Sequence, residues 1–538
     1  MKKALWLLFM FCSSLYAQRS VQVRLFSNQP PASVRIVPRG NTAIDGVAIK
    51  APTEISAARK PVRVTGVFTV EVSGSAPIRL EQPLTIGADG NRLRLLVTQP
   101  LEEYVAAVLA GEASTFKSAE SLKAMAVAIR TYAVRFEGRH AAEGFDLCDT
   151  THCQDFRMTA ITDRLRSAVE STEGEILWFN GRPAATYYHQ DCGGHTEDAA
   201  SVWPGLRDAY LRGQPDTFCL AKGRSDWTTE LTAEELNKAT GAATVEIVSR
   251  TQSGRVHQLR LTGGRNAVVN AEEFRLAIGR ALGWNRVRSD QYQIRKTGDK
   301  YVFQGHGAGH GVGLCQAGAA QMGIAGRNYR DILAFYYPGT KLGINAQGLT
   351  WTRAGGERVE LQTTRPELDR RIIPAADRLA RQVEDELGRR LRSRPVIRVF
   401  PSVATYRDST AEPGWIAAST RGSTIRLQPL EALGANAEKT LHHELMHILV
   451  EQQASPNLPR WFREGMVLAL TEPAAAMTGP MRSPDAIDRS LIRPATREEL
   501  VQAYAAAKML VLQLISKHGK TAVMSWLEAG LPPGVAQR

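Results

Sequence analysis

The sequence lacks several features that would assign it to a protein class at once. Its 538 residues contain no internal repeat and no low-complexity tract, which excludes a repeat architecture. Beyond the N-terminus, no segment is apolar over the roughly 20 residues that a membrane-spanning helix requires. No motif that reads DNA or RNA is present, so we expect no nucleic-acid partner despite the net charge of +13.

The composition is that of a globular protein with substantial cores. Hydrophobic residues make up 43% and charged residues 22% of the chain, and its length predicts two to four domains. The excess of positive charge is compatible with plain solubility. It is equally compatible with an anionic partner such as an acidic lipid or an acidic wall polymer.

The N-terminus has the order of an export signal. Lys2 and Lys3 precede a short apolar run over residues 4–11, and small residues follow as far as Ala17. We therefore expect residues 1–17 to be a signal peptide. The protein would then be secreted, periplasmic or associated with the cell wall, with no transmembrane span after signal removal. A retained N-terminal anchor is the alternative.

Cysteine is scarce beyond this signal. The remaining cysteines are Cys148, Cys153, Cys192, Cys219 and Cys315. The expected compartment permits disulfides, but an odd number leaves at least one thiol free, bound to metal or paired between chains. Cys192 and Cys219 could form a disulfide, whereas Cys315 has no predicted role.

A tight cluster of potential metal ligands surrounds Cys148. His152 and Cys153 follow it closely, and His140 precedes it. Two thiolates and two imidazoles at this spacing could hold a structural zinc. A Cys148–Cys153 disulfide, or free thiols in a packed loop, are the alternatives.

Apolar periodicity predicts an α+β fold. Residues 19–98 alternate as β-strands do, and two helices follow with apolar stripes over 101–109 and 122–136. Ser118 is the expected N-cap of the second helix. Strands and loops mix over residues 140–300.

The chain is predicted to divide after the mixed region. We expect one domain over residues 18–343, a polar linker over 344–357 and a small α+β domain over 358–538. The last domain ends in a long helix, for which Thr496 and Glu499 form a capping box.

Residues 441–452, LHHELMHILVEQ, carry a metal-binding pattern. His443 and His447 are four apart, so on a helix both rings can reach one cation. A tetrahedral zinc with one open position needs a third protein ligand, for which Glu464 in WFREG is the candidate. Glu444 lies on an adjacent facet and could act as the general base. The alternative is a helix that carries these polar residues by chance.

Glu112 ends the first predicted helix on the same apolar face as Val105 and Val108. Partial desolvation there would raise the pKa of the carboxyl group, so that it could protonate a glycosidic oxygen near neutral pH. A helix-end glutamate turned into solvent is the alternative. Arg130, in the second helix, could pair with Glu112 or hold a substrate group, unless it is a surface arginine.

The segment GHGAGHGVG, residues 305–313, has glycine at every second position, which suits backbone packed closely against an extended ligand. It does not satisfy the dinucleotide-binding fingerprint. His310 and Gln316 could form hydrogen bonds to sugar hydroxyls, as could His189 and His195. A structural role is the alternative for each of them.

Five ordered stretches carry a family resemblance. They are LEEYVAAVLAGEASTFKSAESLKAMAVAIRTYA, LCDTTHCQDF, YYHQDCGGHTEDA, GHGAGHGVGLCQAGA and YRDILAFYYPGTKL. Over about residues 20–343 the chain resembles the SpoIID/LytB family of sporulation and amidase-enhancer proteins. The resemblance implies a peptidoglycan lytic transglycosylase with Glu112 as acid/base, which leaves a 1,6-anhydro sugar end. The muramic 6-hydroxyl then replaces water, so a second catalytic carboxylate is not required.

The segment 357–538 resembles the gluzincin metallopeptidases of the peptidase MA-like group, through HELMH, RWFREG and AYAAAKMLVLQLI. This resemblance implies a zinc site made of His443, His447 and Glu464, with Glu444 as general base. It also suggests Tyr504 as a transition-state donor.

The leading hypothesis is a bifunctional cell-wall protein that cleaves glycan strands and carries a zinc peptidase. The negative charge of peptidoglycan would attract this basic chain. The peptidase would act on wall peptides or on a protein partner. A second hypothesis is a non-enzymatic glycan-binding module that stimulates a separate wall amidase. A third makes the peptidase the sole activity.

Overall fold

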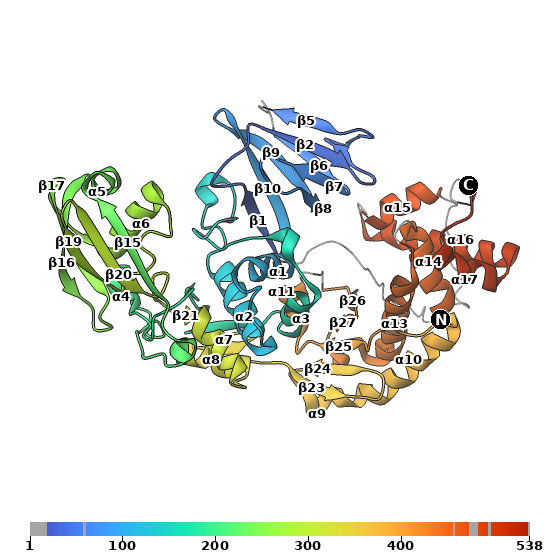
Figure 1. Ribbon diagram of the computed structural model, residues 1–538. Coiled ribbons are helices and arrows are strands. Elements are labelled where there is room, and N and C mark those ends of the chain that lie inside the picture. Colours follow the sequence, from blue (N-terminus) through green and yellow to red (C-terminus); the bar gives the residue numbers. More distant parts are fainter. Residues whose placement is uncertain are drawn as a thin grey trace. The chain divides into compact units, whose positions relative to one another are not determined.

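The computed structural model describes residues 19–56, 61–410, 412, 414–455, 458–472, 483–492 and 496–535. The expected signal peptide, residues 1–17, lies outside these residues. The chain separates into an N-terminal unit, residues 20–349, and a C-terminal unit, residues 350–538 (Figure 1). Within the described residues, no helix is both long and apolar enough to cross a membrane.

Two β-sheets that share one core begin the N-terminal unit. Their strand orders are β11-β1-β10-β9-β6-β3-β4 and β5-β2-β7-β8. The strands are β1 (Ser20–Leu25), β2 (Ser33–Pro38), β3 (Ala43–Ile44), β4 (Val47–Ala48), β5 (Thr53–Ser56), β6 (Val62–Thr65), β7 (Phe68–Glu71), β8 (Ile78–Leu80), β9 (Leu84–Asp89), β10 (Arg92–Pro100) and β11 (Leu147–Cys148). On β1, Val21, Val23 and Leu25 are buried and alternate with more exposed residues, as a strand with one buried face requires. This agrees with the predicted β-rich region over 19–98.

The two predicted helices follow directly. They are α1 (Leu101–Glu112) and α2 (Ala119–Arg135), and both contribute to the same core as the sheets. Ser118 caps α2 by accepting a hydrogen bond from the N–H of Glu120, which confirms the predicted N-cap. Because α2 packs against α1, α3 (Asp163–Ser171), α7 (Gln316–Ile324) and α8 (Tyr329–Tyr336), it fixes the position of the end of α1.

Short strands bring distant motifs of this unit together. β14 (Tyr188–His189) pairs in parallel with β21 (Leu314–Cys315), so the YYHQDCGGH and GHGVGLCQ segments lie side by side. A second small sheet has the order β13-β12-β22. Its strands are β12 (Ile176–Phe179), β13 (Arg182–Pro183) and β22 (Lys341–Gly343).

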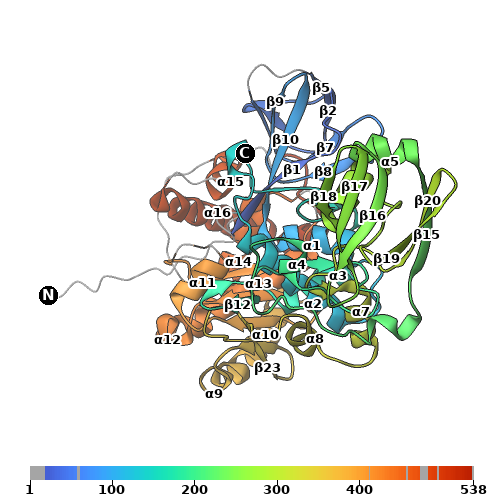
Figure 2. The ribbon, with the colours of Figure 1, turned by 90° about the vertical axis from the view of Figure 1, so that its left-hand side faces the viewer.

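Residues 226–306 form a lobe of the N-terminal unit with its own hydrophobic core, drawn in green in Figure 2. The lobe contains the sheets β15-β20-β19 and β16-β17-β18. Its elements are β15 (Asp226–Thr232), α5 (Ala233–Thr240), β16 (Ala242–Arg250), β17 (Val256–Gly264), β18 (Ala267–Asn270), α6 (Ala271–Leu282), β19 (Tyr292–Thr297) and β20 (Lys300–His306).

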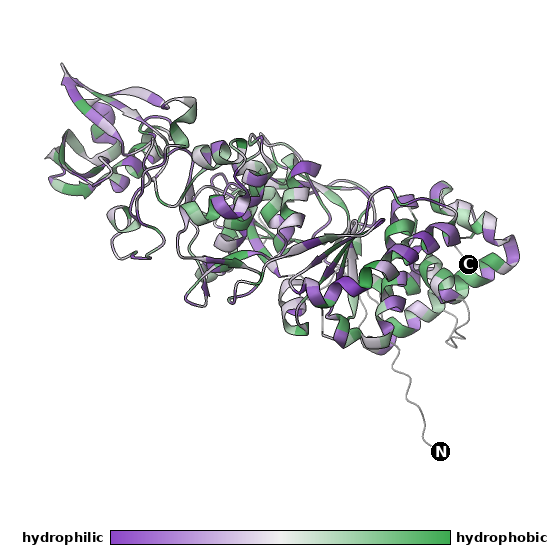
Figure 3. Cartoon of the chain, turned by 90° about the horizontal axis from the view of Figure 1, so that it is seen from below, coloured by the Kyte–Doolittle hydropathy of each residue, from purple (hydrophilic) through white to green (hydrophobic). Residues whose placement is uncertain are grey.

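The C-terminal unit packs helices against one mixed sheet of order β23-β24-β25-β27-β26. The three inner strands run parallel, and the two edge strands run antiparallel to their neighbours. The strands are β23 (Thr352–Gly355), β24 (Glu360–Thr363), β25 (Val396–Val399), β26 (Ala418–Arg421) and β27 (Thr424–Leu427). The main helices are α10 (Ile373–Leu387), α13 (Ala437–Gln453), α14 (Arg460–Thr471) and α16 (Arg497–His518). Figure 3 shows green and purple segments along the helices, as expected for helices with one buried face.

The stretch predicted as a linker contains secondary structure. β23 lies within residues 344–357 and pairs with β24. The prediction of a linker over that whole range was therefore wrong. The polar composition of this stretch resembles that of a linker because β23 is an edge strand whose residues are mostly exposed. The mixed α+β class itself is confirmed. Of the predicted capping box of α16, the hydrogen bond from the Glu499 N–H to Thr496 is present, whereas the Glu499 carboxylate accepts a hydrogen bond from the Ser490 hydroxyl (2.6 Å).

Candidate functional site

Glu112 lies at the C-terminal end of α1, where it lines a cleft of about 1190 Å³ in the N-terminal unit. The preceding residue allows this placement. A Cβ atom at Gly111 would lie 2.2 Å from the carbonyl oxygen of Asp155, so only glycine lets α1 end so close to that loop. Other residues that line the cleft are Tyr187, His189, Trp203, Arg275, His310 and Gln316.

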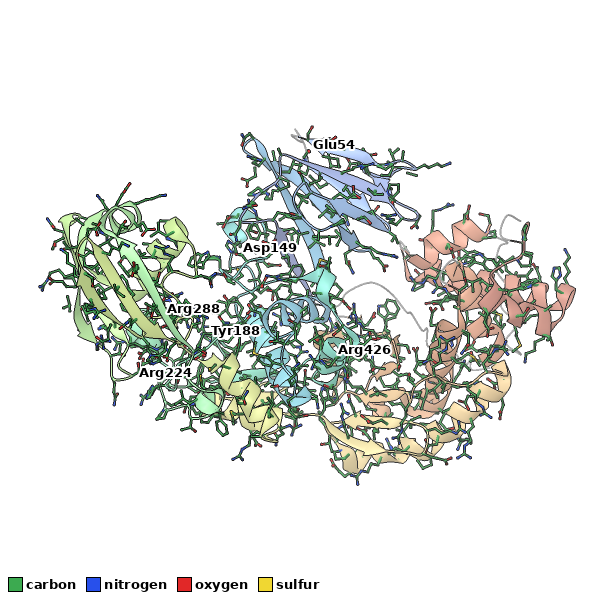
Figure 4. The ribbon with its side chains drawn as sticks, viewed as in Figure 1. Glu54, Asp149, Tyr188, Arg224, Arg288 and Arg426 are labelled. Carbon is green, nitrogen blue, oxygen red and sulfur yellow. The ribbon has the colours of Figure 1, made fainter. Side chains whose placement is uncertain are left out.

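Three donors hold the carboxylate of Glu112. The backbone N–H of Asp155 (3.0 Å) and the hydroxyl of Tyr188 (3.3 Å) donate to Oε1. The side-chain amide of Gln316 donates to Oε2 (3.0 Å). Both carboxylate oxygens are therefore held by groups from distant parts of the chain (Tyr188 is labelled in Figure 4).

A hydrogen-bond chain continues behind Tyr188. The side-chain amide of Gln154 donates to the Tyr188 hydroxyl oxygen (3.0 Å), and the Tyr104 hydroxyl donates to Gln154 Oε1 (3.0 Å). Because the Tyr188 oxygen already accepts a hydrogen bond, its own proton is free to point at Glu112. Sequence reasoning missed these three residues, although all of them lie in motifs that carry the family resemblance.

Burial raises the pKa of the Glu112 carboxyl group above its usual range. The hydrogen bonds from Asp155 and Gln316 act in the opposite direction, and the negative charge of Asp155 adds to the increase. The predicted cause was correct, but the predicted aliphatic surroundings were wrong. Val105 and Val108 point into the core, while Glu112 lies at its edge among amide and hydroxyl groups.

Histidine and aromatic rings form another part of the cleft wall. His189 donates through Nδ1 to the carbonyl oxygen of Val312 (3.1 Å), and its buried Nε2 has no hydrogen-bond partner among the described residues. Burial lowers the pKa of His189 to about 3, so the ring is neutral and Nε2 is an acceptor. The ring centroid of Trp203 lies 4.7 Å from that of Tyr187 and 4.8 Å from that of His310.

Two residues that were predicted to contact the substrate instead form hydrogen bonds within the protein. Arg130 is fully buried and forms a two-pronged ion pair with Glu102, with distances of 2.6 and 2.9 Å, so in this conformation it cannot touch a ligand in the cleft. It does not pair with Glu112 either. The ring of His195 bonds through Nδ1 to the carbonyl oxygen of Thr196 (2.6 Å).

The glycine-rich segment packs against the protein's own backbone. Gly307, Gly309, Gly311 and Gly313 all have positive φ angles, between 72° and 95°. A Cβ atom at Gly313 would lie 2.1 Å from the carbonyl oxygen of Tyr187. The Cβ positions of Gly307, Gly309 and Gly313 face the YYHQDCGGH segment, and that of Gly311 faces Arg255, so these glycines permit close contacts within the protein. That their backbone also lies against an extended ligand stays a prediction.

The predicted zinc ligands His140, Cys148, His152 and Cys153 come together beside the cleft. Their ligand atoms all lie within 4.8 Å of one another. A hydrogen bond from Cys153 lowers the pKa of the Cys148 thiol below its usual range, and Glu143 accepts a hydrogen bond from His140 Nδ1 (2.6 Å). The five cysteines of the described residues are all free, so neither a Cys148–Cys153 nor a Cys192–Cys219 disulfide is present. This donor set fits a tetrahedral zinc.

Comparison with known proteins bears on the N-terminal unit. The family model described as stage II sporulation protein (SpoIID) matches residues 89–179, which contain α1, α2 and Glu112. This match supports the predicted relationship of the N-terminal unit to the SpoIID/LytB family. A second family model, a domain of unknown function (DUF8618), matches residues 224–313, which correspond to the lobe and the glycine-rich segment.

Several known proteins are similar to this chain over long segments. An uncharacterized protein of Brachyspira hyodysenteriae is 33% identical over 252 residues, which cover 45% of this chain and 66% of that protein. Stage II sporulation protein D of Bacillus subtilis is 29% identical over 301 residues, or 52% of this chain and 84% of that protein. The amidase enhancer of Bacillus subtilis is 30% identical over 289 residues, or 44% of this chain and 39% of that protein. The chain thus spans slightly less than two thirds of the first relative and well under half of the amidase enhancer.

The C-terminal unit contains the second predicted site. His443 and His447 lie on α13, with their Nε2 atoms 3.1 Å apart, and Glu464 on α14 places Oε2 3.5 Å from His447 Nε2. Ligands bound to one tetrahedral zinc at about 2.0–2.1 Å are separated by about 3.4 Å. The three side chains are at most 5% exposed. The separations of His447 from His443 and from Glu464 are therefore close to those of ligands on one tetrahedral zinc.

Glu444 lies beside these ligands on α13. It accepts a hydrogen bond from the hydroxyl of Thr420 on β26 (2.6 Å). The hydroxyl of Thr471 lies 3.4 Å from His443 Nδ1, a distance that suits orientation of the ring by its second nitrogen. Tyr504 lies on α16 in the hydrophobic core of the unit, and its role as transition-state donor stays a prediction.

Proposed function

We propose that the protein acts on the bacterial cell wall and that its N-terminal unit is a peptidoglycan lytic transglycosylase with Glu112 as acid/base. The observation that carries the proposal is the position of Glu112, partly buried at the wall of a large cleft and held by three donors. The relatives named as a sporulation protein and an amidase enhancer support a role at the wall.

The chemistry needs one carboxyl group in two protonation states. Protonated Glu112 donates its proton to the glycosidic oxygen as the bond from that oxygen to the muramic C1 breaks. The resulting carboxylate then removes the proton of the muramic 6-hydroxyl, whose oxygen bonds to C1 and closes the 1,6-anhydro ring. The proton count balances, Glu112 is regenerated, and no water is consumed.

The cleft supplies groups that suit a sugar strand. The rings of Tyr187 and Trp203 offer apolar faces with polar edges. The Nε2 acceptor of His189 has no partner among the described residues and could receive a sugar hydroxyl or acetamido N–H. Lys117 and Arg280 also line the cleft and are exposed, and basic groups suit the negatively charged wall.

The decisive experiment uses full-length protein on purified, peptide-free glycan strands. Wild type should release products with anhydro ends, detected by mass spectrometry, and Glu112→Gln should lower that rate by about 100-fold or more. Glu103→Gln is the matched control, because Glu103 is on the same helix and pairs with Arg166 (2.9 Å) rather than lining the cleft. Unchanged cleavage by Glu112→Gln would refute the assignment.

The amidase-enhancer relative favours a second candidate function. In this alternative the cleft binds glycan without cutting it, and the protein stimulates a separate wall amidase. Wild-type protein that releases no anhydro products but accelerates an added amidase would establish this alternative. Glu112→Gln should then retain the stimulation if Glu112 only contributes to binding geometry.

The C-terminal unit is proposed to be a zinc metallopeptidase that acts on wall peptides or on a protein partner. His443, His447 and Glu464 would hold the zinc. The metal, when bound, would supply Lewis-acid activation of water and of the scissile carbonyl. Glu444 would take a proton from the attacking water and return it to the leaving amine, and Thr420 keeps its carboxylate oriented.

The cluster of His140, Cys148, His152 and Cys153 is proposed to hold a structural zinc. Four protein donors leave no open position, which is typical of structural rather than catalytic sites. The hydrogen bond from His140 Nδ1 to Glu143 would orient the ring, as a carboxylate commonly does for zinc-binding histidines. Such a site would brace the loop that leads to Asp155 and so to Glu112.

A further inference from the structure

We propose that Cys192, Asp216, Cys219 and Cys315 form a further site for a soft divalent cation such as zinc. One sulfur from each cysteine and one carboxylate oxygen lie within 4.8 Å of one another. All four residues are buried, with at most 4% of their surface exposed. We call this set the three-cysteine cluster. It shares no residue with the histidine–cysteine cluster around Cys148 or with the site around His443.

Three separate segments build the three-cysteine cluster. Cys192 follows β14, and Cys315 ends β21, so the parallel pairing of those strands brings the two cysteines together across 123 residues. Asp216 lies in the loop before the 3-10 turn Cys219–Lys222, and Cys219 is the first residue of that turn. Cys192 Sγ lies 3.3 Å from Asp216 Oδ2. On a tetrahedral zinc with a Zn–S bond of about 2.3 Å and a Zn–O bond of about 2.1 Å, a sulfur and an oxygen ligand lie about 3.6 Å apart, so this separation suits two ligands of one cation.

Backbone and side-chain donors surround the cluster as they do around metal-bound thiolates. Cys315 Sγ accepts the N–H groups of Cys192 (3.2 Å) and Gly318 (3.3 Å), and it lies at the N-cap of α7, where an anion is favoured. Asp216 accepts a hydrogen bond from the Tyr336 hydroxyl (2.8 Å) on Oδ2 and one from the Cys219 N–H (3.1 Å) on Oδ1. These donors orient the ligands and stabilise their negative charge.

A buried arginine lies next to the cluster. Arg255 donates through Nη2 to the carbonyl oxygen of Cys192 (2.8 Å), and it is 1% exposed. Its Nε and Nη1 have no hydrogen-bond partner within the described part of the chain. Three thiolates and a carboxylate carry more negative charge than a divalent cation neutralises, and the guanidinium of Arg255 would offset part of that excess.

A metal explains the four side chains better than a disulfide does. A disulfide would use two of the three sulfurs and leave the third thiol and the Asp216 carboxyl group together in a dry interior. The Asp216 carboxylate would then keep only neutral donors, the Tyr336 hydroxyl and the Cys219 N–H, and a buried carboxylate without a cationic partner is costly. A soft cation uses all four groups, and thiolates select zinc over magnesium or calcium.

The cysteines of the three-cysteine cluster are close in sequence to residues of the cleft. Cys315 immediately precedes Gln316, whose side chain holds Glu112. Cys192 comes shortly after His189, which lines the same cleft. A cation at the cluster would therefore fix both strands that carry these groups. This consequence rests on the proposed function, whereas the metal site does not.

The first test is the metal content of full-length protein purified in the presence of zinc. The Cys219→Ser/Cys315→Ser double variant should contain one equivalent of zinc per chain less than wild type. Asp226→Asn, at an exposed aspartate paired with Arg224, should leave the content unchanged. An unchanged zinc content in a folded double variant overturns the proposal. The readout does not depend on glycan cleavage, so its failure is distinguishable from failure of the proposed function.

The second test remains decisive if the double variant does not fold. Protein loaded with cobalt in place of zinc should show thiolate-to-cobalt charge-transfer absorption, and Asp216→Cys should increase its intensity because a thiolate replaces a carboxylate ligand. No increase overturns the proposal. In wild type unfolded with a chelator and no reductant, all five cysteines at positions 148–315 should react with an alkylating agent. A resistant pair among Cys192, Cys219 and Cys315 would identify a disulfide and equally overturn it.

Discussion

The side-chain amide of Gln316 donates hydrogen bonds to both the carboxylate Oε2 (3.0 Å) and the backbone carbonyl oxygen (3.2 Å) of Glu112. The first residue of α7 thereby caps the last residue of α1. The carbonyl groups at a helix C-terminus lack intrahelical partners, so this amide satisfies one of them while it also holds the acid. Loss of Gln316 should change the chemistry of Glu112 more than the stability of the fold.

The Gln316→Leu variant should shift the pH dependence of glycan cleavage. The hydrogen bond from Gln316 favours the ionised carboxylate, so its loss raises the pKa of Glu112 further. The reaction starts from protonated Glu112, and the rate falls as pH rises through this pKa. The alkaline limb of kcat/KM should therefore move to higher pH in the variant.

The pH shift must be separated from a general loss of structure. Asp155, which also faces Glu112, is unchanged in this variant. Gln347→Leu, at an exposed glutamine of the same unit, should reproduce the wild-type profile. A Gln316→Leu profile that falls in rate without moving along the pH axis would show that Gln316 does not tune Glu112.

Arg130 should prove to be a determinant of stability. Its bidentate pair with Glu102 is buried, and its guanidinium also donates to the carbonyl oxygens of Val169 (3.2 Å) and Glu175 (3.1 Å). Arg130→Leu leaves a buried carboxylate without its cation, so we expect the free energy of unfolding in urea to fall by about 3–5 kcal/mol.

The double variant Arg130→Leu/Glu102→Leu tests this cause. It should lose less stability than the sum of the two single variants, because no uncompensated charge remains. Arg166→Leu removes the more exposed pair with Glu103 and should cost no more than about 1 kcal/mol. Equal losses for Arg130→Leu and Arg166→Leu would contradict the assignment.

The elements that the sequence predicts well are those with local signals. The apolar stripe of α1, the Ser118 cap of α2 and the strand alternation of β1 depend on neighbouring residues, and each appears as predicted. The α13 pattern places His443 and His447 together for the same reason, since one helix sets their spacing.

The rest depended on long-range contacts that no local pattern contains. Tyr188 reaches Glu112 across 76 residues, and Gln316 reaches it across 204. Arg130 looked like a ligand because arginine is seldom fully buried, and its partner Glu102 lies 28 residues earlier. Cys315 had no predicted role because its neighbours Cys192 and Asp216 come from other segments.

The histidine–cysteine cluster should lose zinc affinity when its supporting carboxylate is removed. Glu143 bonds to His140 Nδ1 (2.6 Å), so Glu143→Gln should raise the zinc dissociation constant about 10-fold or more, measured by competition with a chromogenic chelator. Glu137→Gln, at an exposed position of the same segment, is the control and should have no effect. Equal affinities of the two variants would show that Glu143 does not support the site.

Two variants of the C-terminal site should distinguish loss of the metal from loss of the general base. Glu464→Ala removes a predicted ligand and should lower the zinc content of the full-length protein by one equivalent, with loss of peptide hydrolysis. Glu444→Gln removes only the proposed base. It should keep the zinc and the fold but lower hydrolysis of an unstructured protein substrate by about 100-fold or more.

The control for the C-terminal site lies on the same helix. Glu451 on α13 is exposed and pairs with Arg463 (2.7 Å), so Glu451→Gln should retain both zinc and hydrolysis. Zinc that stays bound in Glu464→Ala would remove this residue from the ligand set. Hydrolysis that survives Glu444→Gln at the wild-type rate would show that Glu444 is not the general base.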